Sequence, residues 1–155
     1  MRIVTVDEAR LGPLLPLLRR YCDFYDVEPS DDDLLALCRA LLRDPEREGV
    51  QILAEDADGR AVGFATVYWT WSTLSASRTA VMNDLFVDPD VRGSGVAEAL
   101  IEECRARARR HGATSLGWQT AHDNVRARAV YERVGALREE WVDYSLDTSD
   151  RPIRR

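Results

Sequence analysis

Short apolar runs alternate along the chain with stretches in which apolar residues recur at helical spacing. The runs predict β-strands over residues 2–5, 50–56, 61–73, 82–87, 114–120 and 141–146. Apolar residues three or four positions apart predict helices behind positions 7, 30 and 95, and the last of these carries Val96, Leu100, Cys104 and Ala108 on one face. The pattern therefore indicates a mixed α/β domain.

Local signals mark where several of these elements begin and end. Asp7 and Ser30 are suitable helix N-caps. Pro13 and Pro16 interrupt the first helical pattern, so we expect a kinked or two-piece helix there. The Asp-Gly pair within residues 57–60 predicts a hairpin turn between two strands.

The stretch from Val81 to Ile101 is a strand followed by a glycine-containing loop and a helix. Pro89 ends the strand, and the loop Arg92-Gly93-Ser94-Gly95-Val96-Ala97 precedes the helix. Unpaired N–H groups and the positive end of the dipole meet at a helix N-terminus, and glycines let a ligand approach closely. The loop alone fits an anion site or an ordinary tight turn equally well, and it matches neither a Walker loop nor the dinucleotide fingerprint.

Composition narrows the class of protein. The 155 residues suffice for one core, and the formal charge of −6 suits a cationic substrate and argues against non-specific nucleic-acid binding. No apolar run approaches the ~20 residues of a membrane span, and no signal-peptide pattern is present. The three cysteines are widely spaced in helical patterns, which suits a reducing cytoplasm. Two histidines without ligand spacing predict no metal site.

The order of the elements predicts where a ligand binds. A strand, helix, strand and helix in succession imply a right-handed crossover and a locally parallel strand pair. Ligands of open α/β sheets bind beyond the carboxyl ends of such strands. We therefore expect the site beyond residue 87 and beyond residue 120.

Two motifs taken together resemble the GCN5-related N-acetyltransferase (GNAT) family. The family's loop reads Arg/Gln-x-x-Gly-x-Gly/Ala and is matched by residues 92–97, while a second motif is matched from Asn124 through Tyr131 to Gly135-Ala136. Residues 62–70 and 83–87 look most like the diamine (spermidine/spermine) branch and related amine acetyltransferases. The resemblance covers most of the chain, to about residue 146.

The resemblance implies a fold, a cofactor and a reaction. We expect one α/β (α+β) domain over residues 1–147, with a mixed, mostly antiparallel sheet, a central splayed parallel pair and about four helices, followed by a polar tail over 148–155. Acetyl-CoA would fill the gap between the splayed strands and donate acetyl directly to a primary amine of a small molecule, such as a polyamine or amino acid. The residues implied to hold it are Leu85, Phe86, Val87, Arg92, Gly93, Ser94, Gly95, Val96, Ala97, Asn124, Ala127 and Tyr131.

Two residues are candidates for the chemistry. Tyr131 shares a helix face with Asn124, and the motif implies that its hydroxyl serves the departing thiolate, mainly as a hydrogen-bond donor because a phenol is a weaker acid than a thiol by ~2 kcal/mol. Asn83 stands where the diamine branch carries Glu, and an amide can orient a water but cannot act as a base. Strand alternation is expected to send Asp84 to the opposite face. Other candidate bases are His122, Asp123, Glu139 and Glu140.

Three residues are candidates for binding the acceptor amine. Tyr21 and Tyr25 lie in an acid-rich stretch that reads equally as a solvated loop, and with Glu140 they suit a cation by charge and by cation–π contact. The aromatic run over residues 68–71 reads as cross-strand packing or as a wall of the acceptor pocket. A protein or peptide acceptor and a non-catalytic acyl-CoA-binding module are the alternatives. Homodimers are common in the family, and residues 141–146 can pair within or between chains.

Overall fold

The structure, a computed structural model, describes residues 1–148. Its elements are β1 (Arg2–Thr5), η1 (Glu8–Arg10), α1 (Leu11–Phe24), α2 (Asp31–Arg43), β2 (Gly49–Glu55), β3 (Ala61–Ser72), β4 (Ser77–Val87), η2 (Pro89–Val91), α3 (Val96–Arg110), β5 (Leu116–Gly117) and α4 (Val125–Arg133). The strands form one sheet in the order β1-β2-β3-β4-β5. All neighbours are antiparallel except β4 and β5, which are parallel. The predicted mixed sheet with a parallel pair and four α-helices is confirmed.

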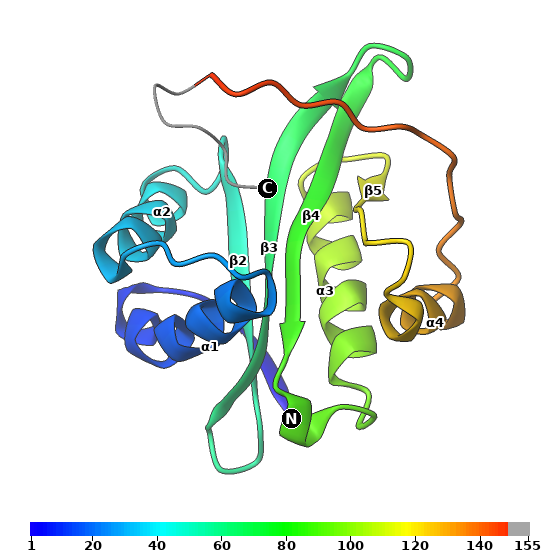
Figure 1. Cartoon of the computed structure of the whole chain (residues 1–155). Helices are drawn as coiled ribbons and strands as arrows, with labels where there is room; N and C mark the ends of the chain where they lie inside the picture. Colours follow the sequence, from blue (N-terminus) through cyan, green and yellow to red (C-terminus); the bar gives the residue numbers. More distant parts are fainter. Residues whose placement is uncertain (149–155) are drawn as a thin grey trace.

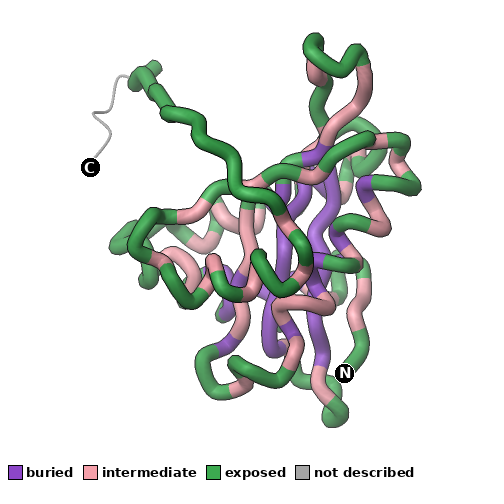
Figure 2. The backbone as a smooth tube through the Cα atoms, turned by 90° about the vertical axis from the view of Figure 1, so that its right-hand side faces the viewer, coloured by how far each residue is buried: buried purple, intermediate pink, exposed green. Residues whose placement is uncertain are grey.

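Helices cover both faces of the sheet (Figure 1). α1 and α2 pack on one face, over a cluster that includes Leu14, Phe64 and Phe86, and α3 packs on the other, where Leu100 meets Ile52. The buried strand residues form the central layer in Figure 2. Full burial of each such side chain stabilises the fold by roughly 1.5–3 kcal/mol. Within residues 1–148, no helix has both the length and the apolar character needed to cross a membrane.

The predicted helix starts are confirmed. Asp7 accepts a hydrogen bond from the Arg10 N–H at 3.1 Å, and Ser30 Oγ accepts one from the Asp33 N–H at 3.1 Å. The first helical segment is in two pieces, η1 and then α1, with Pro16 inside α1. The segment is thus in two pieces, but the break falls between Arg10 and Leu11; α1 continues through Pro13 and Pro16, which were expected to interrupt it.

Two strand predictions at the C-terminal side are wrong. β5 spans only two residues rather than 114–120, and residues 136–148 form no helix or strand, so the strand predicted over 141–146 is absent. A two-residue edge offers too few backbone groups to hold a further strand, and Tyr144 and Leu146 are 94% and 89% exposed. Apart from residue 148, the predicted tail lies outside the described residues.

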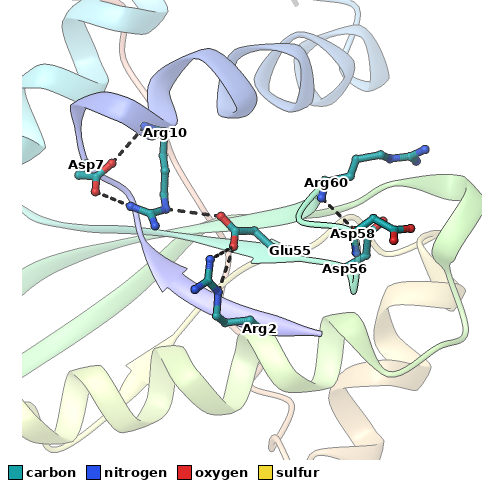
Figure 3. A network of polar contacts seen from close by, with 7 residues as sticks. All are labelled: Arg2, Asp7, Arg10, Glu55, Asp56, Asp58 and Arg60. Atoms are coloured by element: carbon teal, nitrogen blue, oxygen red, sulfur yellow. Dashed lines mark hydrogen bonds and ion pairs between the residues drawn. The ribbon is translucent and has the colours of Figure 1, made fainter.

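A polar network ties β1, η1 and the β2–β3 hairpin together (Figure 3). Glu55, at the end of β2, accepts hydrogen bonds from Arg2 Nε at 3.1 Å and Nη2 at 2.5 Å, and pairs with Arg10 Nε at 3.5 Å. In the hairpin, Asp56 Oδ1 accepts from the Asp58 and Arg60 N–H groups at 3.0 and 2.9 Å. The Arg2 hydrogen bond and both guanidinium charges lower the pKa of Glu55 below its ordinary value.

Replacing Glu55 with Gln is expected to lower the thermal midpoint at pH 7. A carboxyl whose pKa is lowered in the folded state stabilises the protein above its unfolded pKa, and this contribution is lost as the pH falls through the folded pKa. The difference in thermal midpoint between wild type and Glu55→Gln should therefore become smaller below about pH 4.5. Thermal melts from pH 3 to 8 check this, with Glu28→Gln in an exposed loop as the matched control; equal midpoints at pH 7 would refute it.

Candidate active site

The loop between β4 and α3 presents backbone N–H groups at a helix N-terminus. Gly93 and Gly95 adopt φ values of +82° and +85°, and an added Cβ at either would meet no atom within 4 Å. Gly95 is the N-cap of α3 and supplies no side-chain cap. In the part of the chain that the structure describes, the N–H groups of Gly95, Val96 and Ala97 have no acceptor. Three donors and the positive end of the helix dipole therefore face open space, which suits a phosphate.

Asp88 anchors the start of this loop. It is 3% exposed, accepts a hydrogen bond from the Asp90 N–H at 3.1 Å, and pairs with Arg20 at 2.7 Å and Arg60 at 3.2 Å. Burial alone would raise the pKa of Asp88, but the Asp90 N–H and the Arg20 guanidinium outweigh it and lower the pKa. The carboxylate thus fixes the loop to α1 and to the β2–β3 hairpin.

The parallel strands separate next to this loop. β4 and β5 pair only at Ala80 with Leu116 and at Val81 with Gly117. Beyond that point a cleft of about 720 Å³ opens. Its walls are residues 82, 83 and 85–87 of β4, the loop and first turn of α3, residues 118–120 after β5, one face of α4, and the C-terminal end of α1. The splayed pair implied by the resemblance is present, and the cleft lies beyond the carboxyl end of β5 and beside the last residues of β4, which do not pair with β5.

The α4 wall of the cleft carries Tyr131. Asn124 caps this helix, since its Oδ1 accepts a hydrogen bond from the Ala127 N–H at 3.2 Å. The Tyr131 ring meets Trp118 edge-on at 5.3 Å. Burial raises the pKa of Tyr131, and its contact with the Thr120 hydroxyl offsets part of that rise. The hydroxyl is therefore a stable proton-bearing donor at neutral pH.

A β-bulge in β4 corrects the expected alternation of Asn83 and Asp84. Thr66 of β3 pairs with Asp84, but the next residue of β3, Val67, pairs with Met82, so Asn83 is the extra residue. Asp84 lies on the α1 face of the sheet, as Phe86 does two residues later, and Asn83 Nδ2 donates to the Asp84 Oδ1 at 3.0 Å. The two side chains are in contact rather than on opposite faces.

Asp84 is a half-buried carboxyl group without a cationic partner among the described residues. Burial raises its pKa, while Thr66, Tyr21 and Asn83 act in the opposite direction as hydrogen-bond partners. A carboxylate with a raised pKa beside a cleft is a candidate for proton transfer. Sequence reasoning missed Asp84 because no glycine or proline marks the bulge.

The α1 end of the cleft is aromatic. Tyr21 packs edge-on against Tyr25 at 5.1 Å, and Phe24 meets Tyr25 at 5.0 Å. Phe24 and Tyr25 are 60% and 52% exposed, so their rings are open to a ligand. Glu98 also lines the cleft but is held by Arg133 at 2.7 Å. Aromatic faces rather than free carboxylates therefore form this end of the cleft.

Most of the candidate residues meet at the cleft. Those that line it are Tyr21, Tyr25, Asn83, Leu85, Phe86, Val87, Arg92, Gly93, Val96, Ala97, Asn124, Ala127 and Tyr131. Ser94 and Gly95 shape the loop, where Ser94 Oγ donates to the Val91 carbonyl at 2.6 Å. Glu140 is not brought to the cleft: it is exposed and pairs with Arg138 at 3.7 Å, because the strand that would have positioned it does not form.

The aromatic run over residues 68–71 packs elsewhere and does not line the cleft. Trp69 stacks on His111 at 4.2 Å, and Trp71 lies under the Arg78 guanidinium at 4.9 Å. The packing interpretation is therefore the better one: Trp71 packs across the strand pair on Arg78, and Trp69 packs on the C-cap of α3. Trp118 and Gln119, which directly follow β5, also line the cleft, although the sequence analysis did not single them out. Their position could have been found from the sequence, because ligands of α/β sheets bind beyond the carboxyl ends of the strands.

The donor set fits acetyl-CoA. Free N–H groups at the start of α3 and the Arg92 guanidinium suit a pyrophosphate, and the open space at Gly93 and Gly95 leaves room for it. The apolar side chains of Leu85 and Val87 line the path from the loop toward Tyr131. In residues 1–148, no group of three or more His, Cys, Asp or Glu side chains is placed to hold a metal ion.

Several known proteins are similar to this chain in sequence and in fold. Residues 14–136 match the Acetyltransferase (GNAT) family. The chain is 34% identical over 148 residues to the uncharacterized N-acetyltransferase YhfO of Bacillus subtilis (strain 168), covering 95% of this chain and 97% of that protein. It is 31% identical over 118 residues to the aminoglycoside N(6')-acetyltransferase type 1 of Stenotrophomonas maltophilia, covering 74% and 75%.

A solved structure of a probable acetyltransferase superposes with a TM-score of 0.85 at 31% identity, covering 97% of this chain and all of that one. The family match includes both the glycine loop and the helix that carries Tyr131. Sequence, fold and donor set thus agree. The chain belongs to the GNAT family and is an N-acetyltransferase whose acetyl donor is acetyl-CoA.

Proposed function

We propose that this enzyme transfers acetyl from acetyl-CoA to a primary amine of a small cationic molecule. The observation that carries the proposal is the α1 end of the cleft, where Tyr21, Phe24 and Tyr25 stand beside Asn83 and the Asp84 carboxyl group. Aromatic faces attract ammonium groups, and a carboxylate can take up a proton from one of them. The formal charge of −6 favours approach of a cation.

Asp84 is the proton acceptor in this proposal. An alkylamine titrates near 10.4, so holding it neutral at pH 7 costs about 4.6 kcal/mol unless a base removes the proton. Asp84 does not line the cleft itself, but Asn83 and Tyr21, which do, both contact its carboxyl group. The proton passes to Asp84 through one bridging water or hydroxyl beside these two residues.

Tyr131 is the residue proposed to assist departure of the thiolate. Bound acetyl-CoA supplies the thioester, and the Tyr131 hydroxyl hydrogen-bonds its sulfur as negative charge grows there. The raised pKa of Tyr131 keeps the hydroxyl protonated at neutral pH. Backbone N–H groups near Val87 are the proposed donors to the acetyl oxygen.

Tyr131→Phe is expected to lower kcat by about 10- to 100-fold, the value of one hydrogen bond to a developing charge. The Michaelis constant for acetyl-CoA should change little, because the loop and Asn124 are untouched. Steady-state thiol release measures both constants, and Tyr144→Phe on the exposed C-terminal segment is the matched control. Wild-type turnover in Tyr131→Phe would remove Tyr131 from the mechanism.

A panel of acceptors tests the substrate class. Polyamines, lysine analogues, aminoglycosides, neutral amino acids and a lysine-containing peptide should be compared by kcat/KM at fixed ionic strength. The similarity to an aminoglycoside N(6')-acetyltransferase supports including that class. We expect small molecules with two or more amines to lead, and Tyr25→Ala to weaken them most. Preference for the peptide would replace the small-molecule proposal with protein acetylation.

A homodimer is the second part of the proposal. Residues 137–146 expose Leu137, Trp141, Val142, Tyr144 and Leu146, an unusual density of large apolar side chains. If two copies of the chain pack together through this segment, the exposed apolar side chains of both copies are buried at once. Sedimentation velocity should show a dimer for wild type and a monomer for the Trp141→Glu/Tyr144→Glu variant; a wild-type monomer at micromolar concentration would contradict it.

A further inference from the structure

A row of polar side chains crosses the sheet beneath α1 and ends at Asp84. Gln51 of β2 is opposite Thr66 of β3, and Thr66 is opposite Asp84 of β4. Gln51 and Thr66 are 4% and 0% exposed in an otherwise apolar cluster. Buried polar groups are costly unless they are paired, so a row of this kind calls for an explanation.

The hydrogen bonds along this row are donated in one direction, from Gln51 toward Asp84. Gln51 Nε2 donates a hydrogen bond to Thr66 Oγ1 at 3.2 Å, so the Thr66 oxygen is already an acceptor. The Thr66 hydroxyl proton then points to another acceptor, and the carboxyl group of Asp84 across the strand pair is the group it contacts. Gln51 Oε1 is buried without a hydrogen-bond partner among the described residues. With Gln51 Nε2 as the donor and Thr66 Oγ1 as the acceptor, the Thr66 hydroxyl proton is left for a further acceptor.

The groups that face Asp84 from the surrounding elements carry no positive charge. They are Tyr21 and Cys22 of α1, Cys38 of α2, and Thr66 and Tyr68 of β3, together with its neighbour Asn83. Within residues 1–148, Asp84 forms no ion pair. Neutral donors alone therefore balance the burial of this carboxylate, and the loss of one donor should change its proton affinity measurably.

We propose that Thr66, oriented by Gln51, is a positioning residue that fixes the proton affinity of Asp84 for acetyl transfer. The inference rests on the proposed role of Asp84 as proton acceptor. Without the Thr66 donor, the carboxylate would be more basic and would remain protonated over more of the working pH range. Its protonated form can no longer take a proton from the ammonium group of the acceptor.

A direct test follows the Asp84 carboxyl carbon by NMR. The protein is labelled with aspartate carrying 13C in the side-chain carboxyl, and the Asp84 resonance is the one absent from Asp84→Asn. Thr66→Val should raise its titration midpoint by about one to two pH units, the pKa equivalent of one hydrogen bond to a charged group. Thr66→Ser should restore it, and Thr70→Val on the same strand should leave it unchanged. An unchanged or lowered midpoint in Thr66→Val overturns the inference.

Two further measurements keep the outcomes separate. If Thr66→Val does not fold, Gln51→Leu frees the hydroxyl to rotate and should raise the midpoint by a smaller amount; no rise overturns the inference. The acidic limb of kcat/KM, measured with an acceptor amine of low pKa, should move with the NMR midpoint. If the acidic limb of kcat/KM persists in Asp84→Asn, the proposed role of Asp84 as proton acceptor is wrong. A raised Asp84 titration midpoint in Thr66→Val would in that case still show that Thr66 donates to the carboxylate.

Discussion

Asp84→Asn is expected to lower kcat/KM for amine acetylation by about 10²- to 10³-fold, in the range of a lost general base. Asn keeps the size of the side chain and one acceptor oxygen but cannot take up a proton. This carboxyl group lies beside Tyr21 and Asn83, at the end of the cleft where the acceptor is proposed to bind. The acidic limb in the pH dependence of kcat/KM should disappear in Asp84→Asn.

The same substitution is expected to leave the protein at least as stable at pH 7. Burial raises the folded-state pKa of Asp84 above its unfolded value, so the ionised form costs stability at neutral pH, and that cost vanishes as the pH falls below the unfolded pKa. Asp84→Asn should therefore melt at an equal or higher temperature at pH 7 and converge with wild type near pH 3–4.

Kinetics and thermal melts on one preparation check both effects. Asp23→Asn, an exposed acid at the end of α1, is the matched control and should resemble wild type in both. Near-wild-type kcat/KM in Asp84→Asn would contradict the assignment. A marked loss of stability would instead show that the carboxylate holds the fold.

Gly95→Val is expected to weaken acetyl-CoA binding by at least about 100-fold. Gly95 sits at φ +85°, where a β-branched residue is strained, and its Cβ would enter the open space in front of the α3 N-terminus. The three free N–H groups at this point are the main anion donors of the site, so both the added bulk and the altered loop act on the same contact.

Gly59→Val separates these effects from backbone strain alone. Gly59 has φ +80° in the β2–β3 hairpin, and a Cβ there also meets no atom within 4 Å. The two substitutions should lower stability similarly, by roughly 1–3 kcal/mol, but only Gly95→Val should change the dissociation constant. Calorimetric titration with acetyl-CoA measures it; equal affinities in both variants would remove the loop from the binding site.

The parts of the site that depend on local pattern could be predicted from the sequence. Glycines before a helical period mark the loop at residues 92–97, and the spacing of Asn124 and Tyr131 puts both on one face of α4. These signals work because turn geometry and helix period are properties of short segments. The helix caps at Asp7 and Ser30 are predictable for the same reason.

The parts that depend on long-range pairing could not be predicted. The bulge at Asn83 is set by the register of β4 on β3, so simple alternation separated Asn83 from Asp84, whereas their side chains are in contact. Glu140 was assigned to the acceptor site on the assumption of a nearby strand, which requires a longer partner edge than β5 provides. Apolar alternation over 141–146 shows that the segment can form a strand, but not which edge receives it.

Acetyl transfer to an amine can be followed with acetyl-CoA that carries 13C in its acetyl group. The enzyme is mixed with the labelled donor and the best amine of the panel, and NMR monitors the carbonyl carbon. We expect enzyme-dependent loss of the thioester signal with matching growth of an amide signal on the amine, both greatly slowed in Asp84→Asn and Gly95→Val. Loss of the thioester only to free acetate, with no amide on any amine, would contradict this expectation.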